Sequence, residues 1–150
     1  MKLFRSLVVT LLLGASALVS AQERGTKEEA KALADAAAAH VQKVGAEKAS
    51  KDFMQDKAAW TKKDLYVFMY DMKGNCLANG ANNSLVGKNL IDMKDQNGKP
   101  IIAEFTKTVQ TNGTGWVDYE WAHPQTKKVE GKTSYIAKAG EGYVGVGAYR

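Results

Sequence analysis

The stretch DLYVFMYDMKGNCLANG, residues 64–80, decides the fold class. Its first half has apolar side chains on both sides of an extended chain, which is typical of a strand buried on both faces. Asp71 and Gly74 occupy the first and fourth positions of a type I turn, and NCLAN returns after it as an antiparallel neighbour. The stretch therefore predicts a hairpin whose first strand is central in a sheet.

A long helix precedes this hairpin. Thr26, followed three residues later by Glu29, forms a capping box, and apolar residues then recur at helical spacing as far as Val44. Gly45 suits the end of the helix. The sequence predicts a first helix over 27–44, mostly alanine on its buried side, and a second short helix in AEKASKDFMQD.

The rest of the chain completes an α+β fold. From Gly80 to Pro100 the sequence has no clear period, and a segment of this length is often a functional lid. Pro100 then opens a helix that closes at Asn112 and Gly113. Three strands are predicted after it, over 115–122, 128–138 and 143–149. We expect a five-stranded antiparallel sheet with the helices packed against it.

The last of these strands, YVGVGAY, carries Gly145 and Gly147 on one side. Glycine in a strand usually marks the close approach of another group. The favoured partner is the alanine side of the first helix, and a ligand is the alternative.

The first residues have the pattern of a secretory signal peptide. Lys2 and Arg5 precede an apolar run, and Val-Ser-Ala at residues 19–21 places small residues at a cleavage site. We expect residues 1–21 to be removed, leaving 22–150 as one periplasmic or secreted domain. An uncleaved anchor is the alternative, although the run is shorter than the roughly 20 residues that span a bilayer.

Charge and cysteine content exclude several classes of function. Removal of Lys2 and Arg5 lowers the formal net charge from +5 to +3, and the lysines are scattered among acids, which argues against a nucleic-acid partner. Cys76 is the only cysteine, so an internal disulfide, covalent haem and a cysteine zinc cluster are not possible. We expect a buried, unreactive thiol, no cofactor, no metal, and no membrane span in the mature chain.

A set of motifs runs in order through nearly all of the mature chain. It runs from the capped Ala-rich helix ending at Gly45 through Glu47-Lys48-Ala49, Asp52-Phe53, Trp60, DLYVFMYD, Gly74, LVGKNLIDMKD, GWVDYEW, Pro124, Lys132 and Ser134-Tyr135 to a closing GVGAY. This set resembles the single-Cache family of extracytoplasmic sensor domains. The resemblance implies a PAS-like fold, with a long N-terminal helix on a five-stranded antiparallel sheet and a pocket between sheet and lid.

The resemblance also implies a ligand and a partner. Domains of the family bind small organic acids such as acetate, propionate, lactate or pyruvate, and usually sit between two transmembrane helices of a chemoreceptor or sensor kinase. This chain departs from that plan because no second apolar segment follows the first. We therefore expect a small carboxylate ligand, with a separate membrane receptor or sensor kinase as the candidate signalling partner.

Candidate binding residues come from the resemblance and the strand pattern together. Alternation in GWVDYEW places Tyr119 and Trp121 on one apolar side, where a bound carboxylate, a backbone carbonyl or water would satisfy their polar tips. Lys132 and Tyr135 match the family's carboxylate-binding strand, although alternation points them to opposite sides unless a bulge re-aims one. Tyr66 and Phe68 are expected to line the floor of the pocket, and Met93, in the lid, is expected to close it from above.

Two other classes of function stay open. Core packing explains the floor residues almost as well as a ligand does, so one alternative is a non-binding structural or protein-interaction module. The other is a periplasmic enzyme, but His40 and His123 have no evident partner and are expected on a solvated helix and in a turn. We therefore expect a sensory binding domain rather than an enzyme.

Overall fold

The computed structural model describes residues 23–150, so the predicted signal peptide over 1–21 lies outside the described residues. The helices are α1 (Lys27–Val44), α2 (Ala46–Gln55), α3 (Lys57–Trp60) and α4 (Ile101–Asn112), with a short 3-10 helix, η1 (Asn83–Leu85). The strands are β1 (Thr61–Lys62), β2 (Leu65–Tyr66), β3 (Phe68–Asp71), β4 (Cys76–Asn79), β5 (Thr114–Ala122), β6 (Val129–Ala139) and β7 (Gly142–Tyr149). None of the helices in this part of the chain is long and apolar enough to cross a membrane.

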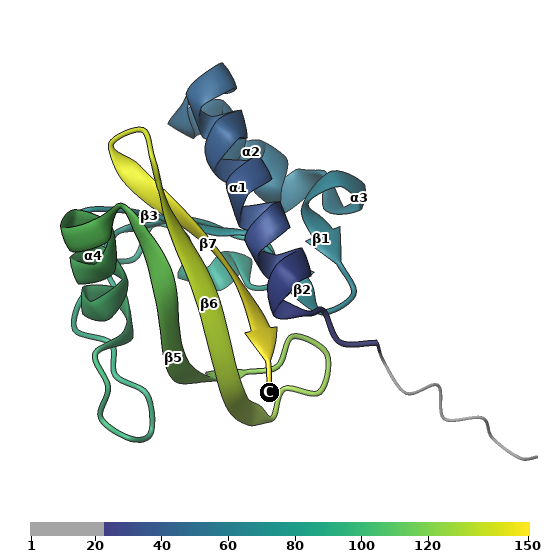
Figure 1. Cartoon of the computed structure of the whole chain (residues 1–150), viewed down its shortest axis with the longest axis vertical. Helices are drawn as coiled ribbons and strands as arrows, with labels where there is room; N and C mark the ends of the chain where they lie inside the picture. The colour runs from purple at the N-terminus through teal and green to yellow at the C-terminus, as the bar shows by residue number, and fades with distance from the viewer. Residues whose placement is uncertain (1–22) are drawn as a thin grey trace, which may run out of the picture.

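One antiparallel sheet contains five of these strands, in the order β4-β3-β7-β6-β5 (Figure 1). The predicted α+β fold with a central first hairpin strand is therefore confirmed. The strand itself is shorter than predicted, because Leu65 and Tyr66 pair with Lys62 and Thr61 in a separate two-stranded hairpin. Only Phe68–Asp71 runs within the main sheet.

Helix α1 packs on one face of the sheet, across β6 and β7 (Figure 1). It begins where predicted, because Thr26 Oγ1 accepts the Glu29 N–H and the Glu29 carboxylate accepts the Thr26 N–H. The small side chains of α1 lie against small or branched ones of β7: Ala30, Ala34, Ala37, Val144, Val146 and Ala148. These residues let the helix approach the sheet closely.

The glycines of β7 do not face this helix, contrary to the favoured expectation. Gly145 and Gly147 alternate with the core residues under α1 and so lie on the opposite face of the sheet. A Cβ added at Gly145 would lie 2.3 Å from the Phe68 ring, and one at Gly147 would lie 2.4 Å from Lys132 Cε. The missing side chains therefore make room for Phe68 and Lys132.

Helix α4 and the segment 80–100 cover that opposite face. The segment is irregular apart from η1, as the sequence predicted. Two of its residues hold it to the edge strand β5: Asp95 Oδ2 accepts the Glu120 N–H at 3.1 Å, and Lys99 Nζ donates to the Asp118 carbonyl. Desolvation opposes the charge of Asp95, but backbone N–H donors, including that of Glu120, outweigh it and lower the pKa of this carboxyl.

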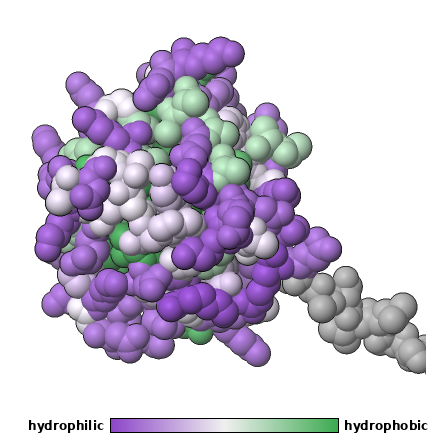
Figure 2. All heavy atoms as spheres, in the orientation of Figure 1, coloured by the Kyte–Doolittle hydropathy of each residue, from purple (hydrophilic) through white to green (hydrophobic). Residues whose placement is uncertain are grey.

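The outer surface on the α1 side is mostly hydrophilic, with hydrophobic residues in small separate groups (Figure 2). The most exposed large apolar side chains among residues 23–150 are Trp116 and Val129. Most of the large apolar side chains therefore lie inside, in one cluster on each face of the sheet.

Candidate ligand-binding site

A small cavity lies between α4 and the sheet face opposite α1. Its volume is about 10 Å³, roughly the space that one water molecule needs. The lining is mainly apolar and aromatic with a few polar groups: Tyr66, Phe68, Tyr70, Asn79, Ile101, Ile102, Phe105, Tyr119, Trp121 and Lys132. Small-molecule sites are commonly built from such a combination.

The ammonium group of Lys132, on β6, is the charge in this cavity. Its side chain is fully buried, and its Nζ donates to the Tyr66 hydroxyl at 2.9 Å. None of the ion pairs among residues 23–150 includes it. Nζ lies 4.2 Å from the Tyr66 ring centroid and 4.9 Å from that of Tyr149, distances at which a ring attracts a cation. Lysine has three donors, so N–H groups of this buried cation are available to an anion.

Further hydrogen-bonding groups surround Lys132. The Tyr119 hydroxyl lies 2.8 Å from Ser134 Oγ, and burial raises the pKa of Tyr119 well above its usual range, which keeps the phenol neutral. Asn79 Oδ1 accepts two backbone N–H groups of the following loop at 2.9 and 3.0 Å. Its Nδ2 group is therefore the part of the amide left to donate. The site combines one cation with neutral donors, which suits an anionic ligand.

A larger cleft with a volume of about 540 Å³ opens beside the cavity. Tyr66 and Trp121 line both spaces. Trp121 is half-buried and lines both spaces, so its indole forms part of the boundary between the small cavity and the cleft. The remaining lining residues of the cleft are Ala81, Asn82, Leu85, Met93, Ala122, His123, Pro124 and Lys127.

The structure brings most of the predicted site residues together. The cavity contains Tyr66, Phe68, Tyr119, Trp121 and Lys132. Met93 borders the cleft instead, because the first turns of α4 rather than the lid roof the cavity. Sequence reasoning missed Asn79, whose only local signal is its place beside Gly80 at the end of the predicted hairpin.

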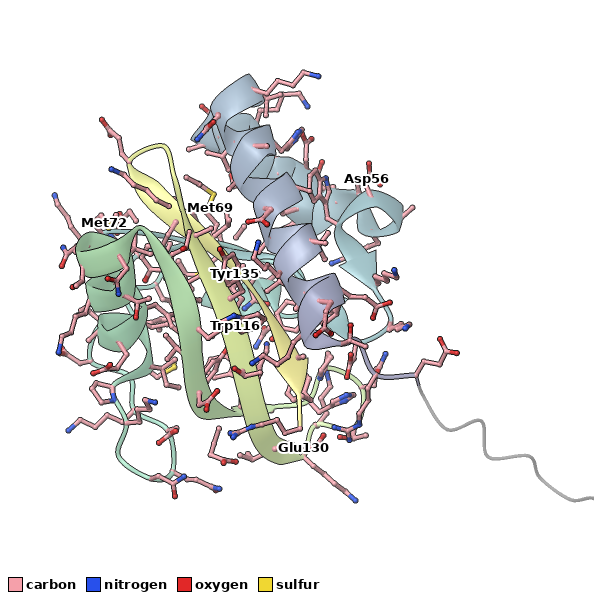
Figure 3. All side chains as sticks on the ribbon, viewed as in Figure 1. Asp56, Met69, Met72, Trp116, Glu130 and Tyr135 are labelled. Atoms are coloured by element: carbon pink, nitrogen blue, oxygen red, sulfur yellow. The ribbon has the colours of Figure 1, made fainter. Side chains whose placement is uncertain are left out.

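Tyr135 does not belong to this site, contrary to the prediction. Its ring lies on the α1 side of β6, 5.2 Å from the Trp116 ring, with Lys31 Nζ 4.9 Å from its centroid (Figure 3). The pairing of β6 with β7 runs from Lys132 to Ala139 without a bulge. Strict alternation therefore places Tyr135 and Lys132, three positions apart, on opposite faces.

Both histidines have acidic partners that the sequence did not reveal. His40 Nε2 lies 2.8 Å from Asp52 Oδ2 and its ring lies 4.8 Å from the Trp60 ring, so His40 is half-buried rather than solvated. His123 Nε2 lies 3.1 Å from Asp64 Oδ2, and both side chains are buried. The partners are separated by 12 and 59 positions, which leaves no local pattern to recognise.

Cys76 lies buried in β4, as predicted. Desolvation raises the pKa of its thiol, which disfavours the reactive thiolate. Across residues 23–150, no group of three or more His, Cys, Asp and Glu side chains is placed to hold a metal ion.

Comparison with known proteins decides the family. The family model described as Single Cache domain 2 matches residues 7–150. This chain belongs to the single Cache domain 2 family. A methyl-accepting chemotaxis protein from Vibrio parahaemolyticus has a crystal structure similar to this Cache domain, with a TM-score of 0.71 and 28% identity over 82% of this chain and 87% of that one. The likeness confirms the predicted fold.

Other relatives of this Cache domain are also sensors. The periplasmic sensor domain of a chemotaxis protein has a TM-score of 0.65 and 27% identity over 81% of this chain and 88% of that one. A Cache chemosensory domain that recognises carboxylic acids shares the fold, with a TM-score of 0.68 and 21% identity over 81% and 91% of the two chains. The sensor histidine kinase MctS of Rhizobium johnstonii is 33% identical over 89 residues, which are 58% of this chain and 19% of MctS. The chain is thus a ligand-sensing domain of the type found in chemotaxis proteins and sensor kinases, a type that is sensory rather than enzymatic.

Proposed function

We propose that this Cache domain binds a short monocarboxylate beside Lys132 outside the cytoplasm and passes the binding event to a membrane receptor or sensor kinase. The observation that carries the proposal is the buried ammonium of Lys132, which has a phenol and aromatic rings around it but no carboxylate partner in residues 23–150. A ligand carboxylate would supply the counter-ion. A charge-assisted hydrogen bond of this kind contributes about 1.5 to 3 kcal/mol.

The walls of the cavity favour a short apolar tail on the acid. Ile101, Ile102 and Phe105 of α4 supply apolar lining within the same cavity as Lys132. An acid of two to four carbons would place its carboxylate at Lys132 and Tyr66 and its tail against α4. Recognition of carboxylic acids by a Cache domain of the same fold is in keeping with this ligand class.

Binding requires the cavity to expand. Its volume of about 10 Å³ admits about one water molecule, which is less than any organic acid needs. Trp121 is the side chain best placed to move, because it is half-buried and borders the open cleft. We expect the ligand to pass from the cleft into the cavity when this indole swings aside.

A thermal-shift screen of acids with two to four carbons tests the proposal. The protein is first unfolded, dialysed and refolded to remove bound ligand, and each acid is compared with its neutral amide. A ligand at about 100 times its dissociation constant adds roughly 2.7 kcal/mol of stability, which is about 10 °C for a domain of this size. We expect at least one acid, and no amide, to raise the melting midpoint.

The same screen separates the alternatives. An interaction module would show no shift with any acid, and this result would contradict the proposal. An enzyme would convert the bound acid, so NMR spectra of the ligand before and after long incubation should stay unchanged if the domain only senses.

A further inference from the structure

Two backbone hydrogen bonds and the imidazole of His123 hold the turn that joins β5 to β6. The His123 N–H donates to the Lys128 carbonyl at 2.8 Å, and the Lys127 N–H donates to the His123 carbonyl at 2.9 Å. Nδ1 of this ring accepts the backbone N–H groups of Gln125 and Thr126 at 3.3 and 3.4 Å. A ring nitrogen that accepts carries no proton, so the proton of the neutral ring lies on Nε2. Nε2 then donates to Asp64 Oδ2 at 3.1 Å. Both ring nitrogens are therefore engaged, and each has a defined role.

The ring is buried and fixed from several elements. The side chains of His123 and Asp64 are 3% and 0% exposed. Asp64 Oδ1 accepts the N–H of Gly25, just before α1, at 2.7 Å. The His123 ring also lies 4.7 Å from the ring of Tyr149 on β7. His123 thus cannot leave its place without disturbing three parts of the chain.

The same turn forms one wall of the open cleft. His123, Pro124 and Lys127 line that cleft together with Trp121. Lys127 has a backbone φ of 63°, a left-handed conformation that a residue other than glycine keeps only when its surroundings hold it. The cleft wall therefore depends on the backbone hydrogen bonds at the base of the turn and, at its tip, on the acceptor that His123 Nδ1 offers to Gln125 and Thr126.

We propose that protonation of His123 at Nδ1 releases the tip of this turn, at Gln125 and Thr126, so that the wall of the cleft responds to pH. The added proton converts the acceptor of two backbone N–H groups into a donor, and those N–H groups lose their partner. The contact between Nε2 and Asp64 persists and becomes an ion pair. The ring therefore stays in place while the tip of the turn moves away from it, the backbone hydrogen bonds at the base of the turn persist, and one proton is taken from solvent.

Some of the charges near this ring favour its protonated form and others oppose it. Asp64 favours the imidazolium, whereas Lys127 and Lys128, on the same turn, oppose it. Tyr149 contributes no charge, because desolvation raises the pKa of its phenol far above neutrality. Two further cations lie close enough to Asp64 to weaken its effect on the ring: Arg24 and Lys63.

NMR of the ligand-free protein from about pH 8 to about pH 5, the range in which histidine titrates, tests the proposal. At high pH the ring nitrogen shifts should show the tautomer protonated at Nε2. As the pH falls, amide exchange protection of Gln125 and Thr126, corrected for the intrinsic rate, should drop about tenfold with the midpoint of the His123 ring. No ligand is used, so the result is independent of the proposed function.

Two variants make the test decisive. His123→Asn keeps an oxygen that can accept the same N–H groups in an Asx turn but does not titrate, so its turn should stay protected at every pH. Asp64→Asn keeps the ring and removes the anion, so the midpoint should move to lower pH. Constant protection while His123 titrates, a tautomer protonated at Nδ1, or the parent's pH dependence in His123→Asn would overturn the proposal. If His123→Asn does not fold, constant protection of Gln125 and Thr126 in Asp64→Asn while His123 titrates still overturns it.

Discussion

Replacement of Lys132 by methionine removes the charge of the cavity but keeps an unbranched side chain of similar length. Because Lys132 is fully buried, its desolvated charge is unfavourable in the free protein, and apolar replacements of buried charges are often neutral or stabilising. We expect the melting midpoint of the free variant to stay or to rise. Lys132→Ala would instead leave a cavity, at the cost of about 2 to 5 kcal/mol typical of large-to-alanine core substitutions.

The effect on binding follows from the single contact that is lost. A charge-assisted hydrogen bond worth about 1.5 to 3 kcal/mol corresponds to a loss of affinity by a factor of about 10 to about 150. At an acid concentration of about 100 times the parent's dissociation constant, stabilisation should fall from about 2.7 kcal/mol to between about 1.4 and about 0.3 kcal/mol. The thermal shift should shrink by at least about half.

Both measurements use the acid that stabilises the parent most. Calorimetry would give the affinity, and thermal shift would give the stabilisation. Lys138→Met is the matched control, because Lys138 lies on the same strand and the same side of it but is exposed. The control should bind like the parent. Parent-like affinity in Lys132→Met would refute the reasoning, since the buried ammonium would then contribute nothing to recognition.

Three other predictions concern stability and reactivity. Gly147→Ala would place a Cβ 2.1 Å from Ser134 Oγ and 2.4 Å from Lys132 Cε. Denaturant unfolding should therefore show a free energy of unfolding lower by about 1 to 3 kcal/mol. An unchanged midpoint would contradict this, because the strand would then adapt without cost. Cys76 should react with a thiol reagent far more slowly in the native than in the unfolded protein, because it is buried, and similar rates would contradict this. Hydrogen bonds from the Thr26 N–H and two lysines lower the pKa of Glu29 from 4.5 to about 2, so this carboxylate stabilises the fold above about pH 4.5 and loses that contribution as the pH falls toward 2. Glu29→Gln should therefore flatten the pH dependence of the unfolding free energy in that window, and an unaltered slope would argue against the capping role.

The elements that could be predicted depend on residues close together in the chain. The capping box of Thr26 and Glu29 spans three positions, and it places the start of α1 correctly. The predicted turn between Asp71 and Gly74 likewise joins β3 to β4, with the Gly74 N–H donating to the Asp71 carbonyl at 3.2 Å. The break between β2 and β3 escaped prediction because it depends on which strand Leu65 and Tyr66 pair with.

The candidate site was predictable only in part for the same reason. Alternation correctly grouped Tyr119 with Trp121 and placed Lys132 and Tyr135 on opposite sides. The match of Tyr135 to a family motif could not override that alternation. Asn79 also lines the cavity. Its place there depends on where the end of β4 lies relative to the other lining residues, and no local sequence pattern encodes that position.

The amino-acid sequence by itself determined the order of the longer helices and of the five strands of the main sheet, and hence the α+β class, because these follow from propensities and hydrogen bonds between near neighbours. Only the tertiary structure decided which face of the sheet holds the cavity. Gly145 and Gly147 have the same local sequence whichever way they face, and packing alone turned them toward Phe68 and Lys132. It also brought His123 to an aspartate 59 positions away, a contact that exists because separate turns close over the same end of the sheet.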